Sequence, residues 1–352
     1  MLNKEDRLIR LLSFGEIDAP RRDEIIRIAG QGLDWDYIVE SASREGVSSF
    51  IFDRISSSGL KDIVPVPFFY CLRSVYYTYS AQNLLLFNEL SSVLSALNGQ
   101  RIPTILLKGS VLAERVYGNI ALRPLRDMDI LVRRHDVTGA VSALEALGYS
   151  PIASVKDQLD DPFSYSVTLS KQGIGMNTGA SIDLHWHILN ASWLMGLCSK
   201  KCDIERLWSL AEYGNISGVR SCVLSRAHFL ISLAVNAFTH SYHRLILLVD
   251  IDKALGFYKG TIAMDSLFLE AGRCGLEDIL DITLNDILLS EHSGKTRGHI
   301  AGHVFKREYR SFRPCLMYIL ACRSTVKRFK AVFGIIRVAI LIFIFRLKPK
   351  KS

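Results

Sequence analysis

The sequence predicts an α+β protein in which a small mixed β-sheet lies between an N-terminal helical segment and a C-terminal helical domain. Three observations predict this class: helical spacing of apolar residues over residues 1–100, short apolar runs of strand length over 101–190, and helical spacing again after Asn190. The chain has 352 residues, 49% of them apolar and 22% charged. This composition allows a buried core and excludes a disordered, collagen-like or low-complexity protein.

The N-terminal segment, residues 1–100, predicts helices because apolar residues such as Leu8 and Ile25 recur at helical intervals. A longer periodic stretch from Phe69 to Leu97 predicts one long, well-buried helix. We expect that helix to end at Asn98-Gly99, a common C-terminal capping pair.

The middle segment, residues 101–190, predicts the order strand, helix, strand, helix, strand, strand, and we expect it to be the catalytic core. The last two strands flank a loop with three glycines, which indicates a long hairpin. The expected strands are 103–107, 128–132, 163–169 and 181–188, and the expected helices are 111–117 and 137–147.

We expect a C-terminal helical domain over 191–305, with no strand after Asn190, and a basic, apolar amphipathic tail over 306–352. The expected helices of this domain are 225–237, 242–258 and 264–288.

Positive charge is concentrated in the tail. The chain has a net charge of +8, whereas residues 305–352 alone carry thirteen Lys or Arg against one acid, Glu308, a net charge of +12. The remainder of the chain therefore carries −4. Phosphate tracking needs a basic surface, so we expect no nucleic-acid partner for the body of the protein.

Within the tail, four cations at helical spacing form one stripe beside an apolar surface. Such a helix suits an anionic membrane interface, and a terminal helix docked on the body is an equally good interpretation. Arg337 interrupts the apolar stretch, which argues against a membrane span. The four cations are Arg323, Lys327, Lys330 and Arg337.

The cysteines and the N-terminus indicate a cytoplasmic protein. The seven cysteines form no C-x-x-C pair, which is typical of buried thiols in a reducing compartment. The N-terminus mixes acids and bases around a very short apolar run, unlike a secretory signal. We expect a cytoplasmic protein that is peripheral on the inner membrane if the tail binds lipid.

Three aspartates carry the chemical signal. Asp127 and Asp129 are two residues apart at the start of an expected strand, so both carboxylates face one point. Asp183 lies within a later strand, on the same face as His185 and His187. Clustered carboxylates repel one another unless a cation lies between them, and hard oxygen ligands suit Mg²⁺.

The turn Lys108-Gly109-Ser110 supplies the complementary half of the site. A glycine between a strand and a helix lets backbone N–H groups approach an anion closely, and the beginning of a helix favours phosphate. Two metal ions held by carboxylates can clamp the attacking and leaving oxygens of a displacement at phosphorus, while a third carboxylate accepts the proton of the incoming hydroxyl.

The order L-L-K-G-S, R-P-L-R-D-M-D-I-L-V and I-D-L-H-W resembles the nucleotidyltransferase superfamily that includes DNA polymerase beta. More narrowly, it resembles a bacterial family of uncharacterised nucleotidyltransferases, over roughly residues 30 to 260 and most closely over 105 to 187. The resemblance implies a small mixed-sheet nucleotidyltransferase core and transfer of an NMP from an NTP, with release of pyrophosphate, to an unidentified hydroxyl or phosphate acceptor.

The resemblance also implies residue roles. Asp127, Asp129 and Asp183 would be catalytic and would bind two Mg²⁺ ions, with Mn²⁺ as a substitute. Lys108, Gly109, Ser110 and Arg123 would bind the nucleotide. An alternative interpretation of Lys108 is an ordinary exposed lysine. The alternative interpretation of Arg123 is an anchor for the acidic strand.

Four further residues have alternative interpretations. His185 either orients Asp183 or is a buried structural histidine. His240, Arg244 and Asp250 match the resemblance and either line a cleft that faces the core or form salt bridges between helices.

Two other functions stay open: transfer to a macromolecule such as an RNA end or a protein side chain, and a non-catalytic nucleotide-binding or scaffold protein at the membrane surface. Arg126, directly before the first aspartate, is the feature that favours the non-catalytic alternative.

Overall fold

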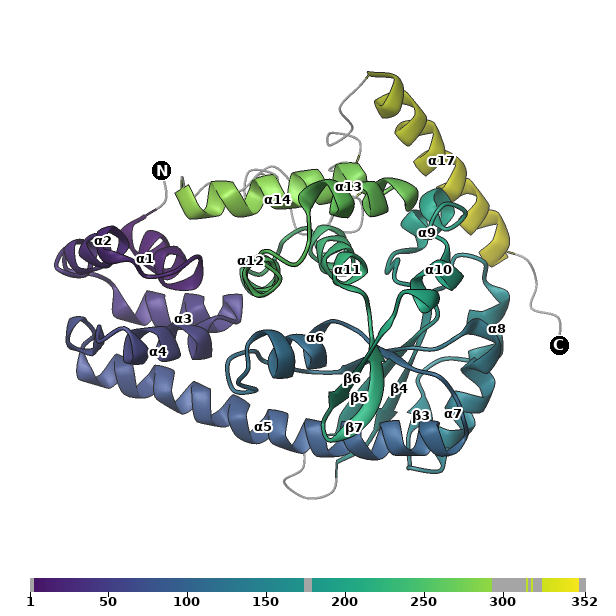
Figure 1. The fold of residues 1–352 in the computed structure, drawn as a ribbon, viewed down its shortest axis with the longest axis horizontal. Coiled ribbons are helices and arrows are strands. Elements are labelled where there is room, and N and C mark those ends of the chain that lie inside the picture. The colour runs from purple at the N-terminus through teal and green to yellow at the C-terminus, as the bar shows by residue number, and fades with distance from the viewer. Residues whose placement is uncertain (1–2, 174–178, 293–314, 316–317, 319–324, 348–352) are drawn as a thin grey trace.

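The computed structural model describes residues 3–173, 179–292, 315, 318 and 325–347. It confirms the predicted class, a mixed α/β protein in which a sheet is flanked by N-terminal and C-terminal helices (Figure 1). The described part of the tail is one helix, and the rest of 306–352 lies largely outside the described residues.

The N-terminal segment is helical, as predicted, and local capping explains its boundaries. Asp34 accepts a hydrogen bond from the backbone of Tyr37 at the start of α3, and Gly46 ends that helix with φ 76°. The helices are α1 (Lys4–Ser13), α2 (Ala19–Ala29), α3 (Trp35–Glu45), α4 (Ser48–Ser57) and α5 (Val66–Gly99), with a short 3₁₀ turn at Lys61–Ile63.

Helix α5 connects the two halves of the molecule. It packs against α3 and α4 at one end and against α7 and the strand Val219–Val223 at the other (Figure 1). It is less buried than expected, because Leu84 and Leu85 are about half exposed, and the left-handed residue after it is Arg101 rather than Gly99.

The described strands form one mixed sheet of seven strands in the order β3-β4-β5-β2-β1-β7-β6. Strand β2 pairs in parallel with β5 and antiparallel with β1, so it lies at the centre of the sheet. The strands are β1 (Ile105–Leu106), β2 (Met128–Leu131), β3 (Ser150–Pro151), β4 (Ser166–Lys171), β5 (Ala180–His185), β6 (Glu212–Ile216) and β7 (Val219–Val223).

Short helices cover the sheet. Helix α7 packs against α5, and α6 lies between β2 and the C-terminal helices. The helices of this part are α6 (Lys108–Val111), which continues as a π-helical turn (Leu112–Val116), a 3₁₀ turn (Arg134–Asp136), α7 (Val137–Glu145), α8 (Val155–Asp160), α9 (Ser192–Cys198) and α10 (Ile204–Ser209).

The expectation that no strand follows Asn190 is wrong. Strands β6 and β7 form a hairpin that extends the sheet beyond the expected end of the core. Its two turn residues, Ser217 and Gly218, both have positive φ, the geometry of a tight hairpin turn. Alternating Val219, Ser221 and Val223 in β7 were the missed strand signal.

The C-terminal domain is otherwise helical. The helix expected over 264–288 is two helices, because Gly275 adopts φ 69° between them. The helices are α11 (Arg226–Thr239), α12 (Ile246–Phe257), α13 (Met264–Arg273), α14 (Glu277–His292) and α17 (Thr325–Leu347).

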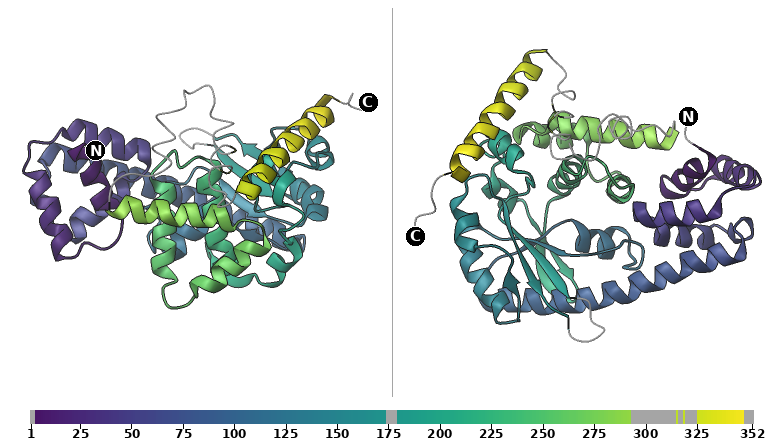
Figure 2. Two further views of the ribbon diagram at one scale, coloured as in Figure 1. Left: turned by 90° about the horizontal axis from the view of Figure 1, so that it is seen from above. Right: turned by 180° about the vertical axis from the view of Figure 1, so that it is seen from behind.

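Helix α17 packs against α9, at the end of the molecule opposite the N-terminal helices (Figure 2). No helix among the described residues combines the length and apolar character that crossing a membrane requires.

Candidate active site

Two aspartates from neighbouring strands form the centre of the site. Strands β2 and β5 run in parallel, and Asp129 is the register partner of Asp183. Asp129 is buried and Asp183 is half-buried. Oxygens of these two carboxylates and a ring nitrogen of His185 all lie within 4.8 Å of one another, a spacing that could hold a metal ion.

Asp127 lies directly before β2 and interacts with the same charges. Burial, together with the negative charges of Asp129 and Asp183, raises the pKa of Asp127 to about 6. The three predicted carboxylates therefore share one electrostatic environment. The group with metal-ligand spacing among the described residues, however, contains His185 where we expected Asp127.

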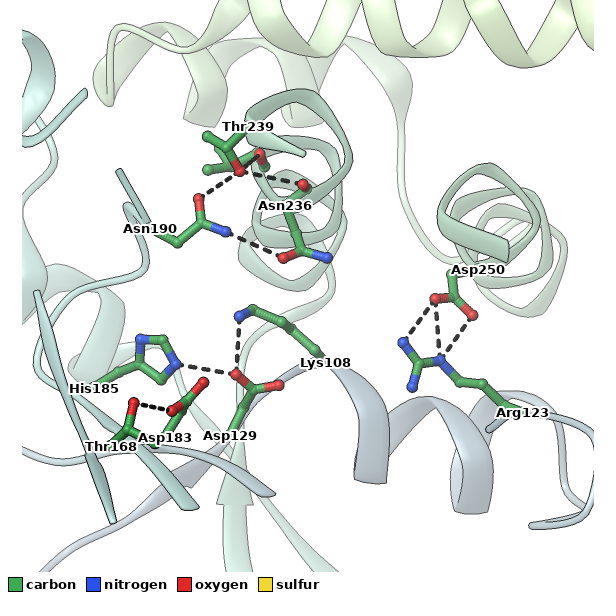
Figure 3. Close-up of polar contacts among 11 residues, drawn as sticks. Lys108, Arg123, Asp129, Thr168, Asp183, His185, Asn190, Asn236, Thr239 and Asp250 are labelled. Atoms are coloured by element: carbon green, nitrogen blue, oxygen red, sulfur yellow. Dashed lines mark hydrogen bonds and ion pairs between the residues drawn. The ribbon is translucent and has the colours of Figure 1, made fainter. Parts of the chain in front are cut away.

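Asp129 is held ionised by two partners. Burial alone would raise the pKa of Asp129, but Lys108 and His185 overcome this effect and lower it well below its usual range. The ammonium of Lys108 donates to Asp129 Oδ1 at 2.9 Å, and His185 Nε2 lies 3.0 Å from the same oxygen (Figure 3).

His185 hydrogen-bonds to Asp129 rather than to Asp183, the carboxylate that it was expected to orient. Its Nε2 contacts Asp129, while Asp183 Oδ1 accepts a hydrogen bond of 2.6 Å from the Thr168 hydroxyl. The His185 ring stacks on Tyr165, with centroids 6.2 Å apart. Its Nδ1 is buried and has no hydrogen-bond partner among the described residues. His187 points elsewhere, because its Nδ1 accepts from the backbone of Leu189.

Lys108, Gly109 and Ser110 form the first residues of α6, directly after β1. Lys108 adopts φ 40°, a left-handed conformation that aims its side chain at Asp129. A Cβ on Gly109 would lie 2.9 Å from both Arg123 Nη1 and Leu125 Cδ2, so a side chain at this position would displace these two neighbours. Ser110 Oγ is buried and has no hydrogen-bond partner among the described residues.

Arg123 is engaged by Asp250 of α12. Its Nη2 lies 2.9 Å from Asp250 Oδ2, its Nε contacts both carboxylate oxygens at 3.0 Å, and both side chains are buried (Figure 3). The Tyr117 hydroxyl also donates to Asp250, at 2.9 Å. This geometry matches two of the expected alternatives, an anchor for the acidic strand and a salt bridge between elements.

Helix α5 fixes the segment that leads from Arg123 to the acidic strand. Asn83 is buried, and its amide donates to the carbonyls of Ile120 and, at 2.8 Å, of Arg123. Its Oδ1 accepts from the backbone of Leu125 at 3.3 Å. Sequence analysis missed Asn83, although a polar residue on the apolar face of a long helix is a detectable signal.

His240 and Arg244 follow α11. Burial and the positive charges of His243 and Lys108 lower the pKa of His240, whereas Asp129 acts in the opposite direction, so His240 lies within electrostatic reach of the site. Burial and the charge of Arg126 lower the pKa of Arg244. Arg244 Nε donates to the carbonyl of Arg44 at 3.1 Å.

The donor set fits a divalent cation. Two ionised or ionisable carboxylates, Asp127 and Asp183, lie beside Asp129, and oxygen donors of this kind are the ligands that Mg²⁺ and Mn²⁺ prefer. Mutual repulsion within the group is a cost that a bound cation removes. The Lys108 ammonium contacts Asp129 and supplies part of the positive charge that balances the carboxylates.

Among the comparisons with known proteins, a family model gives the match that identifies the family. A search of curated proteins gives no match. A crystal structure of an antigenic nucleotidyltransferase-like protein from Paracoccidioides brasiliensis is similar over 56% of this chain and 92% of its own, at 11% identity and a TM-score of 0.35. The model of the family described as uncharacterised nucleotidyltransferase matches residues 31–285, which include the sheet, the three aspartates and α11 to α13. The chain therefore belongs to this nucleotidyltransferase family.

Proposed function

We propose that the protein is a metal-dependent enzyme that transfers an NMP from an NTP to a hydroxyl or phosphate acceptor and releases pyrophosphate. The observation that carries this proposal is the in-register pair of Asp129 and Asp183, with Asp127 beside it, opposite the Lys108-Gly109-Ser110 turn. Family membership supports the reaction class. We also propose that the protein belongs to the superfamily that includes DNA polymerase beta. We propose further that it is a bacterial protein located in the cytoplasm.

Each residue has a role in this proposal. Bound Mg²⁺, held by Asp127, Asp129 and Asp183, supplies charge neutralisation at the reacting phosphate. Asp183 accepts the proton of the acceptor hydroxyl, and Thr168 fixes the orientation of its carboxylate. His185 holds Asp129 in place.

The nucleotide phosphates bind at the turn. Gly109 allows close approach of the backbone, Ser110 offers a buried hydroxyl that lacks a partner among the described residues, and Lys108 offers a positive charge. Arg123 has the alternative roles of phosphate contact and anchor. Its contacts with Asp250 and its position against Gly109 favour the anchor role.

The intact carboxylates argue against the non-catalytic alternative, since a protein without turnover has no need to keep three repelling aspartates together. Arg126 is exposed, and no ion pair with Asp127 is found among the described residues, so it does not block that carboxylate. Transfer to a macromolecule stays as the second candidate, and the negative charge of the body disfavours RNA.

A transfer assay tests the proposal. Purified full-length protein is incubated with each of the four α-phosphate-labelled NTPs, Mg²⁺ and a cell lysate, beside an Asp129→Asn control. Transfer that disappears in the control supports the proposal and identifies the labelled acceptor. Absence of transfer with every NTP, with Mn²⁺ as well, despite measurable NTP binding, supports the non-catalytic alternative.

Helix α17 favours a peripheral membrane location as part of this proposal. It docks on the body by one side, where the buried Val338 lies against Gly196 of α9. Its other side presents Phe333, Ile336 and Ile340, which are 71%, 51% and 53% exposed and recur at helical spacing. With the net charge of +12 over 305–352, this surface suits an anionic bilayer.

Vesicle sedimentation tests this location. Full-length protein should pellet with phosphatidylcholine vesicles that contain phosphatidylglycerol, but not with phosphatidylcholine alone, and salt should weaken the binding. The double variant Phe333→Ser, Ile336→Ser should stay in solution. The control Leu84→Ser, Tyr213→Ser removes exposed apolar side chains elsewhere and should pellet normally. Equal pelleting of both double variants would contradict the membrane role.

A further inference from the structure

A group of uncharged polar side chains lies across from the carboxylates, on α11 and on the segment that follows β5. Its members are Asn190, Asn236 and Thr239, and we refer to them as the amide cluster. In Figure 3 the amide cluster lies on the far side of Lys108, Asp129 and His185 from the sheet. Helix α11 packs against α6, which carries Lys108, so the cluster borders the same space.

Hydrogen bonds within the amide cluster fix its orientation. The Thr239 hydroxyl lies 2.8 Å from Asn190 Oδ1 and 2.8 Å from the carbonyl of Val235, and it donates to one at a time. Asn190 Nδ2 donates to Asn236 Oδ1 at 3.1 Å. Among the residues that the structure describes, Asn236 Nδ2 has no acceptor, although the other half of its amide is tied in place. Because this donor is already oriented, little side-chain entropy is lost when it binds a ligand.

The electrostatics of the last turn of α11 support its proximity to the site. His240, the next residue after Thr239, interacts with the charges of both Lys108 and Asp129. The end of α11 therefore lies near the reacting groups.

The chemistry of the amide cluster points to hydroxyl groups. Amides and hydroxyls both donate and accept, so they recognise sugar hydroxyls by reciprocal hydrogen bonds, whereas phosphate oxygens are preferentially bound by Lys and Arg. The positively charged side chain that we propose for phosphate binding, Lys108, is not part of the amide cluster. Two hydroxyl-bearing groups lie beside the reacting phosphorus: the ribose that stays bonded to it and the acceptor that attacks it, while pyrophosphate leaves.

We propose that the amide cluster binds a sugar hydroxyl beside the reacting phosphate, with Asn236 Nδ2 as the specificity-determining donor. This inference rests on the proposed function, since it names the substrate group that the same site recognises. The hydroxyl is either the 2′-hydroxyl of the NTP ribose or a hydroxyl of a sugar acceptor, and one set of measurements separates these sources.

The test uses full-length wild type, Asn236→Ala and Asn236→Leu, which keeps the approximate shape of the side chain without a charge but loses the donor. Asn98→Ala is the matched control, because that amide bonds to Arg220 on the surface, away from the amide cluster. Binding of the four NTPs and the four 2′-deoxy-NTPs is measured with Mg²⁺ by calorimetry, and α-label transfer is measured against increasing amounts of lysate.

A ribose contact predicts that wild type prefers NTP over deoxy-NTP, and that both Asn236 variants lose about tenfold in NTP affinity without a change for deoxy-NTP. A contact with an acceptor sugar predicts unchanged nucleotide affinity and about a tenfold rise in the lysate needed for half-maximal transfer, with little change in the maximal rate. Asn98→Ala should match wild type in both assays.

Two results would overturn the inference. One is an active wild type with Asn236 variants that match it in every assay. The other is an equal loss of NTP and deoxy-NTP affinity in both variants, which indicates a general structural defect. A wild type that binds no nucleotide and transfers no label would instead remove the proposed function, and this inference with it.

Discussion

Asp129 and Asp183 are register partners on the parallel strands β2 and β5, and each carboxylate is held by its own hydrogen-bond partners. Lys108 and His185 hold Asp129, and Thr168 holds Asp183. Two acids more than fifty residues apart in the sequence thus converge on one point, with a spacing that could hold a metal ion.

The first prediction is that Asp127→Asn and Asp129→Asn have opposite effects on the stability of the metal-free protein. The pKa of Asp127 is raised to about 6, so its ionised form destabilises the fold above that pH and has no effect below the unfolded pKa near 4. The pKa of Asp129 is lowered, so its ionised form stabilises the fold above the unfolded pKa, and this contribution disappears as pH falls through the lowered value.

Thermal unfolding near neutral pH should therefore show a higher Tm for Asp127→Asn and a lower Tm for Asp129→Asn than for wild type. The gain in Asp127→Asn should shrink as pH falls from about 6 to about 4. Shifts in the same direction for both variants would contradict this assignment of the charges.

The second prediction concerns the pH dependence of metal binding. Because Asp127 must lose its proton to bind a cation, Mn²⁺ affinity should fall by up to about tenfold per pH unit below a pH of about 6. Calorimetric titration of wild type and Asp127→Asn checks this result. Asp127→Asn should bind Mn²⁺ more weakly than wild type, and its affinity should no longer depend on pH in that range. If the affinity of the variant still depends on pH, the titrating group is a different residue.

The third prediction separates two roles of Lys108. Its ammonium contacts Asp129, and we expect it to bind nucleotide phosphates when a cation is bound by the acids. Lys108→Met should therefore lose about tenfold or more in NTP affinity, the effect of one charge-assisted hydrogen bond. Binding of Mn²⁺ without nucleotide should stay as tight as in wild type or become tighter, because the competing positive charge is gone. Weaker Mn²⁺ binding in this variant would show that Lys108 supports the metal site itself.

The fourth prediction concerns the buried pair of Arg123 and Asp250. Asp250→Ala leaves a buried guanidinium without its partner and should lower the free energy of unfolding by about 3–5 kcal/mol. Tyr117→Phe, which removes one hydrogen bond to the same carboxylate, should cost only about 1 kcal/mol. Denaturant unfolding measures both changes.

Two variants control this measurement. The exposed Asp62→Ala should change stability far less than Asp250→Ala. The double variant Arg123→Met, Asp250→Leu should recover most of the loss, because it removes both buried charges. A mild effect of Asp250→Ala would show that Arg123 finds another partner.

The sequence predicted the elements around the aspartates well, because their signals are local. The strand 128–132 and the helix that ends at Gly148 follow from alternation and helical spacing, and the structure has β2 and α7 there. The three aspartates were identified from their spacing and from the family resemblance. Their convergence depends on the pairing of β2 with β5, which no local pattern encodes.

What was missed depends on tertiary contacts. Asn83 lies on a helix far from the site in sequence, and its role follows only from the approach of the segment 120–125. His185 was expected either to orient Asp183 or to be a buried structural histidine, but its ring reaches across to Asp129 on the adjacent strand. The β6–β7 hairpin was overlooked because its strands are short and half polar.

The most direct test of the central claim is the fate of two labels. With the NTP that the protein uses, the acceptor should gain label from the α-phosphate and none from the γ-phosphate, and pyrophosphate should appear in equal amount. Asp129→Asn and Asp183→Asn should each reduce this transfer by more than about 100-fold, beyond the loss expected for a residue that only supports a ligand. Transfer of the γ-label, or α-label transfer that persists in both variants, would contradict nucleotidyl transfer at these carboxylates.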